Sequence, residues 1–381
     1  MIEPFTARIP QADVDDLLRR LAGTRWAPEQ PPGSEDGAYG VPLSRLRRLV
    51  SRWEKFDWRS WEDRLNAYPQ FRTTIGGQQV HFLHVKSAAP DALPVVLSHG
   101  WPGSVFEYIE LIGRLTDPAA YGGDPADAFH VVLPSLPGYG FSGPAHEPGW
   151  GTRRIAAAWA ELMALLGYER YGAIGNDAGS MISPELGRLE PDRVAGVHVT
   201  QIFSFPSGDP AELGGLDEEE QAAMTVLNWF WQNKGAFNVL QGQQPQTLAH
   251  ALADSPAGLL GWNAQLFDET LDDDFVLANV TLYWLTETAA TSIRHYYEDT
   301  HSAAAPAPGP TTVPLGLAAA AEGDFRSIRR FAERDNAQIT SWTRLPDVTG
   351  HYSAYTNPDQ LAADIRRFFR PLRPSATAKE I

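Results

Sequence analysis

Gly175-Asn176-Asp177-Ala178-Gly179 directly follows the apolar run at residues 171–174. A small residue two positions before and two positions after a central polar residue is typical of a nucleophile elbow. This sharp strand-to-helix turn lifts one side chain above the sheet. The central residue here is an aspartate, and a carboxylate nucleophile displaces at saturated carbon to leave an alkyl ester. The elbow therefore favours epoxides or carbon–halogen bonds as substrates over esters or amides.

Strands and helices alternate on both sides of this turn. The predicted strands lie at residues 80–85, 94–98, 129–133, 171–174, 194–202, 313–318 and 339–345. Helical periodicity occurs between them, at 105–115 and 155–166, and a last helix is predicted from Asn357-Pro358. Such alternation predicts a mostly parallel sheet with helices on both faces. Together with the elbow, it predicts an α/β-hydrolase fold.

Four regions are expected along the chain. Residues 1–75 form a helical lead-in, with amphipathic helices at 11–22 and 43–53. Residues 76–203 form the first part of the α/β core, and 204–302 carry only helical signals, with candidates at 216–233, 255–267 and 274–297. This all-helical stretch is interpreted as a cap over the active site. Residues 303–381 complete the core, beginning with a stiff Ala- and Pro-rich linker at 303–310.

Composition excludes several classes of site. The 381 residues include no cysteine, so disulfides, thiolate metal sites and cysteine nucleophiles are excluded. A net charge of −16 disfavours binding to a nucleic acid backbone. Without a secretory leader or a long apolar run, the protein is expected to be cytoplasmic, with no membrane segment. The glycine-rich turn at 138–143 lies between prolines, so no dinucleotide site is expected there. The acidic runs at 217–220 and 272–274 are expected to cap helices, so neither a metal nor a cofactor is expected.

A carboxylate nucleophile requires donors for a developing oxyanion. The expected donors are the backbone N–H of Ala178 and that of Trp101, in the loop at 99–104 that follows the strand at 94–98. His99 lies in the same loop, where it is expected either near the substrate or as a support for the loop's shape.

The chain order nucleophile, acid, histidine identifies the remaining candidates. His351 follows the last predicted strand and is the candidate base that activates water. Asp324 and Glu322 follow the strand before it, and either could orient His351. Both also lie near the start of a helix predicted at 325–334, where negative charge is stabilising on structural grounds alone.

The chain resembles the microsomal-type epoxide hydrolases over nearly all of its length. The stretches that carry the resemblance are the loop at 99–104, the turn at 138–142, the aspartate elbow, and, near the N-terminus, residues 24–26, 57–59, 65–71 and 81–84. The resemblance implies that Asp177 attacks an epoxide carbon and that His351 activates water to release a diol. It also implies two cap tyrosines that bind the epoxide oxygen, and Tyr296 matches one of them.

Three positions depart from the family pattern. Phe237 stands where the second cap tyrosine is expected, and it cannot donate a hydrogen bond; Tyr297 or Tyr283 could substitute. Gly323 stands at the acid position, between Glu322 and Asp324. Ala178 stands where a tryptophan often follows the nucleophile in this family, and the smaller side chain leaves room for a bulkier substrate. These departures bear on rate and substrate, and they leave a specialised biosynthetic role open.

Two alternatives to an epoxide hydrolase stay open. A dehalogenase uses the same Asp–His–acid machinery, although halide release needs no proton donor such as Tyr296. A repurposed, non-hydrolytic scaffold would bind an apolar ligand under the cap. Under the leading hypothesis the partners are an apolar, aromatic or bulky epoxide and water. The sequence leaves the oligomeric state open, with a homodimer as one option.

Overall fold

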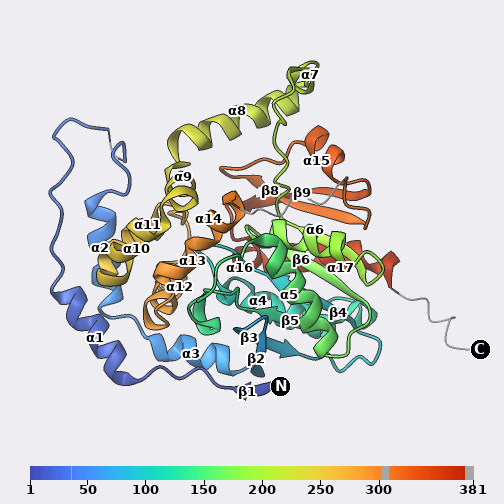
Figure 1. Cartoon of the computed structure of the whole chain (residues 1–381), viewed down its shortest axis with the longest axis horizontal. Helices are drawn as coiled ribbons and strands as arrows, with labels where there is room; N and C mark the ends of the chain where they lie inside the picture. Colours follow the sequence, from blue (N-terminus) through green and yellow to red (C-terminus); the bar gives the residue numbers. More distant parts are fainter. Residues whose placement is uncertain (36, 302–308, 374–381) are drawn as a thin grey trace, which may run out of the picture.

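The computed structural model describes residues 1–35, 37–301 and 309–373 (Figure 1). The described residues form one nine-stranded sheet in the order β1-β2-β3-β5-β4-β6-β7-β8-β9. The strands β4 to β9 pair in parallel, and β1, β2 and β3 form an antiparallel extension that joins at β5. The strand bounds are β1 Glu3–Phe5, β2 Gln70–Ile75, β3 Gln78–Val85, β4 Leu93–Ser98, β5 Phe129–Pro134, β6 Tyr171–Gly175, β7 Val194–Val199, β8 Leu315–Glu322 and β9 Ile339–Thr349.

Helices cover both faces of this sheet. An added Cβ on Gly172 would lie 2.5 Å from Phe369 of α17 (Pro358–Phe369), whereas one on Gly175 would meet α6 (Gly179–Leu189). Residues three apart on a strand point to opposite faces, so α17 and α6 lie on opposite sides of β6. Helix α5 (Thr152–Leu165) packs beside α6, and α4 (Ile109–Thr116) packs beside α17. The predicted α/β-hydrolase fold is confirmed.

The lead-in at residues 1–75 is not only helical. Besides α1 (Gln11–Ala22), α2 (Leu43–Trp53) and α3 (Trp58–Asn66), it supplies β1 and β2 to the sheet. Strand β2 pairs with β3 in register Phe71↔Phe82, and those two rings stack with centroids 5.7 Å apart. Strand β2 contains Phe71, Thr73, Thr74 and Ile75, which are residue types that favour strands, so the expectation of a purely helical lead-in overlooked a signal present in the sequence.

The region interpreted above as a cap contains helices α7 to α14, and we keep the name cap for these helices. Their bounds are α7 Pro210–Leu213, α8 Glu218–Asn233, α9 Ala236–Gln243, α10 Pro245–Asp254, α11 Pro256–Ala264, α12 Asp273–Leu285, α13 Ala289–Ser292 and α14 Arg294–His301. The single helix expected at 274–297 is therefore wrong. Glu287 has a positive φ of 57°, a left-handed conformation that a continuing helix does not accommodate, so the chain breaks after α12. Most of the expected linker lies at 302–308, outside the described residues.

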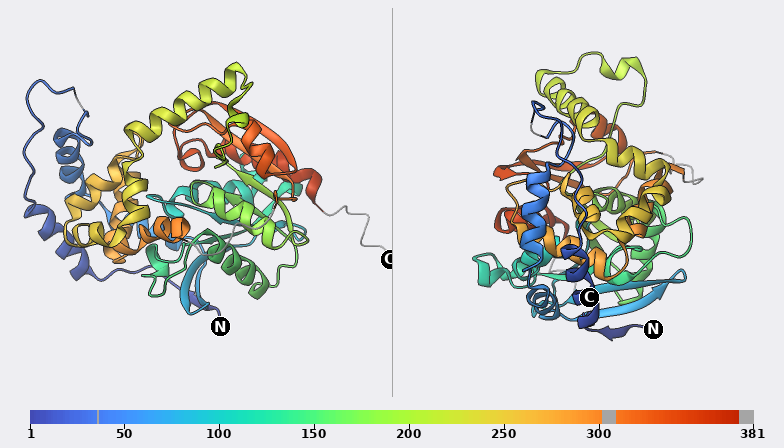
Figure 2. Two further views of the ribbon diagram at one scale, coloured as in Figure 1. Left: turned by 45° about the horizontal axis from the view of Figure 1, so that its top comes forward. Right: turned by 90° about the vertical axis from the view of Figure 1, so that its left-hand side faces the viewer.

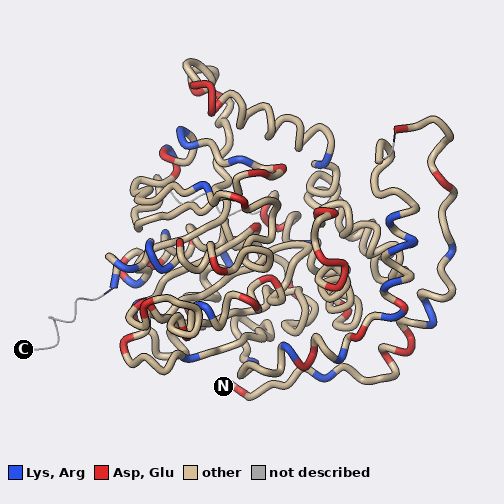
Figure 3. The backbone as a smooth tube through the Cα atoms, turned by 180° about the vertical axis from the view of Figure 1, so that it is seen from behind, with Lys and Arg blue, Asp and Glu red and all other residues tan. Residues whose placement is uncertain are grey.

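The N-terminal helices lie along the outer side of the cap (Figures 1 and 2). The indole N–H of Trp53 donates to Thr281 Oγ1 at 2.7 Å, and both residues are buried. Arg52 forms a 2.6 Å ion pair with Asp274, and the basic residues of α2 stand out in Figure 3. The lead-in thus contacts the cap through a buried hydrogen bond and an ion pair.

Cap helix α8 packs against the α/β core near α15. Ala223 and Leu227 of α8 form a separate apolar cluster with Ile328 and Phe331, which lie at α15 (Arg329–Asp335).

Among residues 1–35, 37–301 and 309–373, none of the helices combines the length and apolar character that crossing a membrane requires.

Candidate active site

Asp177 lies at the turn between β6 and α6 with a positive φ of 53°. This left-handed conformation is costly for a non-glycine residue and typically persists at functional sites. The flanking glycines make the turn possible, since a Cβ on Gly175 would lie 2.0 Å from Gly179 O. A Cβ on Gly179 would lie 1.9 Å from Ser98 O. The small residues of the elbow are thus required by close backbone approach.

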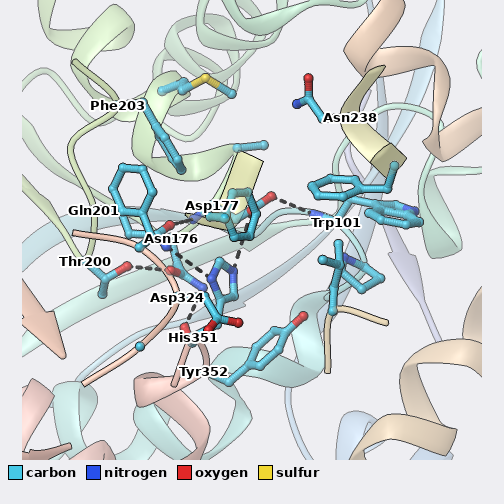
Figure 4. A pocket seen from close by; sticks show the side chains of 18 of the residues that line it. Trp101, Asn176, Asp177, Thr200, Gln201, Phe203, Asn238, Asp324, His351 and Tyr352 are labelled. Atoms are coloured by element: carbon cyan, nitrogen blue, oxygen red, sulfur yellow. Dashed lines mark hydrogen bonds and ion pairs between the residues drawn. The ribbon is translucent and has the colours of Figure 1, made fainter. Parts of the chain in front are cut away.

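The loop after β4 places one donor at the nucleophile. The Trp101 N–H donates to Asp177 Oδ1 at 2.9 Å (Figure 4). Ala178, at the N-terminus of α6, lines the same cavity, where the helix dipole favours negative charge. One carboxylate oxygen therefore occupies the expected oxyanion position, while Oδ2 faces away from Trp101.

His99 supports this loop from behind. Its ring is fully buried, with Nδ1 3.1 Å from Gly100 O, and the Leu136 N–H donates to Nε2 at 3.2 Å. Burial lowers the pKa of His99 to about 4, so the ring is neutral at physiological pH. Of the two roles considered for His99, the geometry supports the one in which it holds the loop.

His351 faces the nucleophile from the loop that follows β9. Its Nε2 lies 3.6 Å from Asp177 Oδ2. Its Nδ1 lies 3.2 Å from Nε2 of Gln201, whose Oε1 accepts from the Asp177 N–H at 3.3 Å (Figure 4). The structure thus brings the predicted nucleophile and base together, with a glutamine on the far side of the imidazole.

The two candidate acids occupy different environments. Asp324 lines the same cavity as His351, but its carboxylate pairs with Lys234 at the end of α8. Glu322 is exposed at the end of β8, and only its backbone oxygen, which accepts from Gly350 N–H at 3.0 Å, supports the histidine loop. Across the described residues, neither carboxylate is hydrogen-bonded to His351.

A buried network lies behind the nucleophile. Asn176 Nδ2 donates to Glu107 Oε1 at 2.7 Å and to the backbone oxygen of His351 at 3.2 Å, and Thr200 Oγ1 donates to Asn176 Oδ1. Burial raises the pKa of Glu107 well above its ordinary value, and the nearby Asp177 adds to this effect. Asn176 therefore ties the elbow to the histidine loop, and the buried Glu107 holds the Asn176 amide in place.

Two aromatic rings of the cap, Phe237 and Tyr296, meet the ring of Trp101 from the core loop at the wall of the cavity that holds Asp177. Trp101 stacks on Phe237 with centroids 5.7 Å apart, and Tyr296 meets both rings edge-on, at 6.0 Å and 5.8 Å. Burial, and then the charge of Asp177, raises the pKa of Tyr296 well above 10, so its hydroxyl stays protonated. The expected cap tyrosine and the expected phenylalanine are thus neighbours at the cavity wall.

The two tyrosines considered as substitutes for the missing donor lie elsewhere. Tyr297 is 38% exposed and stacks on His301 at 4.0 Å, because the next residue on a helix is rotated by about 100° from Tyr296. The Tyr283 hydroxyl donates to Gly103 O at 2.6 Å. Neither residue lines the cavity, so neither replaces the donor that Phe237 lacks.

The cavity has a volume of about 280 Å³ and a mainly apolar wall. Its apolar side chains include Met181, Phe203, Phe205, Phe230, Trp231 and Leu266. A polar pair also reaches it, since Nε2 of the buried His295 lies 3.1 Å from Oδ2 of the half-buried Asp299. Although burial opposes it, the charge of Asp299 raises the pKa of His295.

Sequence reasoning missed Gln201, Lys234 and Glu107. Gln201 follows β7, the strand next to the elbow strand, at the edge of the sheet where the carboxyl ends of parallel strands meet. Ligands bind at that edge in open α/β sheets, so this position was a detectable signal for Gln201. Lys234 and Glu107 carried no comparable signal.

Comparisons with known proteins agree with this geometry. The family model for the epoxide hydrolase N terminus matches residues 2–108, and the alpha/beta hydrolase fold model matches 94–276. A Stigmatella aurantiaca protein with a provisional epoxide hydrolase name is 42% identical over 98% of this chain and 86% of its own length. Juvenile hormone epoxide hydrolase 2 of Ctenocephalides felis is 32% identical over 96% of this chain and 84% of its own.

A solved structure extends the similarity to three dimensions. The epoxide hydrolase of Aspergillus niger superposes with a TM-score of 0.85 at 29% identity, covering 98% of this chain and 97% of that one. The similarities therefore span the lead-in, the core and the cap together. The chain belongs to the microsomal-type epoxide hydrolase family and is a hydrolase.

Proposed function

We propose that the protein opens an apolar epoxide through a covalent ester on Asp177. The observation that carries this proposal is the division of labour between the two carboxylate oxygens. Oδ1 accepts a hydrogen bond from the Trp101 N–H at 2.9 Å, whereas Oδ2 lies 3.6 Å from His351 Nε2. Oδ2 attacks an epoxide carbon, a new C–O bond forms, and the C–O bond of the ring breaks.

Tyr296 donates the proton that the departing oxygen requires. An alkoxide is a poor leaving group without an acid, and positioned proton donors contribute about 10²–10⁴-fold to such reactions. The burial that raises the pKa of Tyr296 keeps this donor protonated under working conditions. Phe237 beside it supplies shape and an apolar surface, so one hydroxyl performs work for which the family resemblance implies two.

His351 then releases the product. It takes a proton from water, the hydroxide attacks Cγ of the ester, and Trp101 and Ala178 N–H groups stabilise the oxyanion at Oδ1. The bond between Cγ and Oδ2 breaks, and the imidazolium returns its proton to the departing alkoxide. The vicinal diol carries the former Oδ2, and Asp177 keeps the oxygen of the water. The proton left on the regenerated Asp177 carboxyl returns to the Tyr296 phenolate, which restores both groups.

Asp324 is the better candidate of the two carboxylates for stabilising the imidazolium. Its side chain lines the cavity with His351, whereas Glu322 is exposed outside the cavity. Because Lys234 holds its carboxylate, Asp324 would act on His351 through its charge and not through a direct hydrogen bond.

An aromatic or otherwise bulky epoxide suits the cavity best. A volume of about 280 Å³ with several phenylalanine and tryptophan side chains in the wall favours an apolar group of some size. The small Ala178 next to the nucleophile leaves additional room.

The test uses His351→Gln incubated with racemic styrene oxide. Without the base, the ester should form and persist, adding the mass of the whole epoxide to Asp177 in peptide mass spectra. A single turnover of the wild type in ¹⁸O-water should label Asp177 and leave the first diol unlabelled. An adduct that forms only from a haloalkane, with loss of halide, would assign the protein as a dehalogenase instead.

A further inference from the structure

Gln201 joins the nucleophile to the base. Its Oε1 accepts from the Asp177 N–H at 3.3 Å, and its Nε2 lies 3.2 Å from His351 Nδ1. Figure 4 shows Gln201 beside His351 on the side away from Trp101. One half-buried side chain therefore touches both groups on which the proposed function depends.

The direction of these bonds decides which imidazole nitrogen carries the proton. An amide NH₂ that donates to Nδ1 requires Nδ1 to be unprotonated, so the proton lies on Nε2 and points toward Asp177 Oδ2. A base that takes a proton from water at Nε2 needs the opposite tautomer, with a proton on Nδ1 and an acceptor beside it. The observed hydrogen bonds suit the enzyme before ester formation and oppose its action as a base.

The charge of Asp177 explains why the first arrangement is stable. Before the reaction, Nε2–H faces a carboxylate anion, which is a strong acceptor. After alkylation the same oxygen belongs to a neutral ester, so this preference disappears. Asp324, which lines the same cavity as His351, is occupied by Lys234.

We propose that Gln201 is a positioning residue that sets the tautomer of His351 for each step, an inference that rests on the proposed function. Once the ester forms, the amide turns over so that Oε1 accepts from Nδ1–H, and Nε2 becomes free to take a proton from water. The change moves one proton from Nε2 to Nδ1 through solvent and leaves the net charge unchanged. In this second arrangement the Asp177 N–H has lost its acceptor. This loss favours rotation of the Gln201 amide back to its first orientation once the diol has left.

Two variants separate the steps. Gln201→Met keeps the side-chain length and removes both hydrogen bonds. We expect decay of the ester to slow at least tenfold, while ester formation changes less than threefold. Gln201→Glu supplies a permanent acceptor to Nδ1–H, so decay of the ester should recover. Gln338→Met, at an exposed position before β9, controls for the substitution itself. Stopped-flow measurements with styrene oxide give both rates.

A second readout needs no substrate. Nitrogen NMR of the free enzyme, with His351 assigned from the His351→Gln spectrum, should show the Nε2–H tautomer in the wild type and the Nδ1–H tautomer in Gln201→Glu. An Nδ1–H tautomer in the free wild type, or normal ester decay in Gln201→Met together with slow decay in Asp324→Asn, would overturn the proposal. If no epoxide alkylates Asp177, the proposed function fails, and the NMR result still decides the role of Gln201.

Discussion

Lys234, at the end of cap helix α8, pairs with Asp324, which follows core strand β8. Both side chains are partly exposed, 34% and 39% respectively, so water screens their attraction. Such pairs contribute about 0–1 kcal/mol to the free energy of unfolding. The significance of this pair is therefore its place at the cavity rather than its contribution to stability.

Removing the two partners should have unequal effects on activity. Asp324→Asn removes the negative charge from the cavity wall, so we expect decay of the ester to slow about tenfold, a loss of about 1.4 kcal/mol of transition-state stabilisation. Lys234→Met should leave that charge in place and preserve the decay rate. Urea unfolding should change by less than about 1 kcal/mol in both variants. Equal loss of activity in both variants would contradict a role for the Asp324 charge.

Gly100 is required by the position of the nucleophile. A Cβ at Gly100 would lie 2.0 Å from Asp177 Oδ1, so Gly100→Ala must displace the carboxylate from the Trp101 N–H. We expect kcat/KM to fall about 10²-fold or more, as when one oxyanion donor is lost. Gly261→Ala is the matched control, since its nearest neighbour there, Leu46, is 3.6 Å away. Full activity of Gly100→Ala would show that the hydrogen bond from the Trp101 N–H to Asp177 Oδ1 is not needed for the reaction.

Restoring a hydroxyl at position 237 should speed ring opening. Phe237 lies 5.8 Å from the Tyr296 ring and lines the cavity, so Phe237→Tyr adds a second donor on the same wall. We expect ester formation to accelerate about tenfold, at the low end of general acid catalysis, with ester decay unchanged. Phe230→Tyr, also in the cavity wall, is the control. An equal acceleration in both variants would point to general polarity rather than to a positioned donor.

Glu107 should make stability depend on pH. Because burial raises its pKa, the folded protein keeps the Glu107 proton over a range in which the unfolded chain releases it. The free energy of unfolding must therefore fall as the pH rises through that range, by about 1.4 kcal/mol for each pH unit between the unfolded and folded pKa values. Glu107→Gln should remove this fall, so its stability should gain on that of the wild type as the pH rises above the ordinary pKa of a glutamate. Urea titrations of both proteins, with the exposed Glu3→Gln as control, measure the difference; parallel curves would contradict the prediction.

The sequence predicts the contact between Trp101 and Asp177 well, because both follow parallel strands whose carboxyl ends meet. It predicts the partner of His351 poorly. The candidate acids follow the right strand, yet whether Asp324 meets His351 or Lys234 depends on where the cap lies. That choice is made by tertiary packing between segments far apart in the chain, and no local pattern records it.

The cap shows the same limit. Helical periodicity predicts α8, α11 and α12, but it offers no separate candidate for α7, α9 or α10. The positive φ of Glu287 marks the break that ends α12 at Leu285. Tyr296 and Tyr297 are adjacent in the sequence, and the rotation of α14 decides which of them faces the nucleophile. Once a helix is interrupted, its phase cannot be carried across the break.

The path of the N-terminal segment limits how the active site can open. Strand β1 lies in the sheet, where Glu3 is opposite Arg72 of β2 in the strand register. The segment then runs along the cap through α1 and α2 and returns to the sheet through α3 and β2. The N-terminal segment therefore runs across the cap and is anchored to the sheet at both ends, and Trp53 hydrogen-bonds to Thr281 of the cap. Rigid-body opening of the cap would have to break these contacts. Substrates would enter by local movement of the side chains around the cavity mouth, and selection by size would occur there.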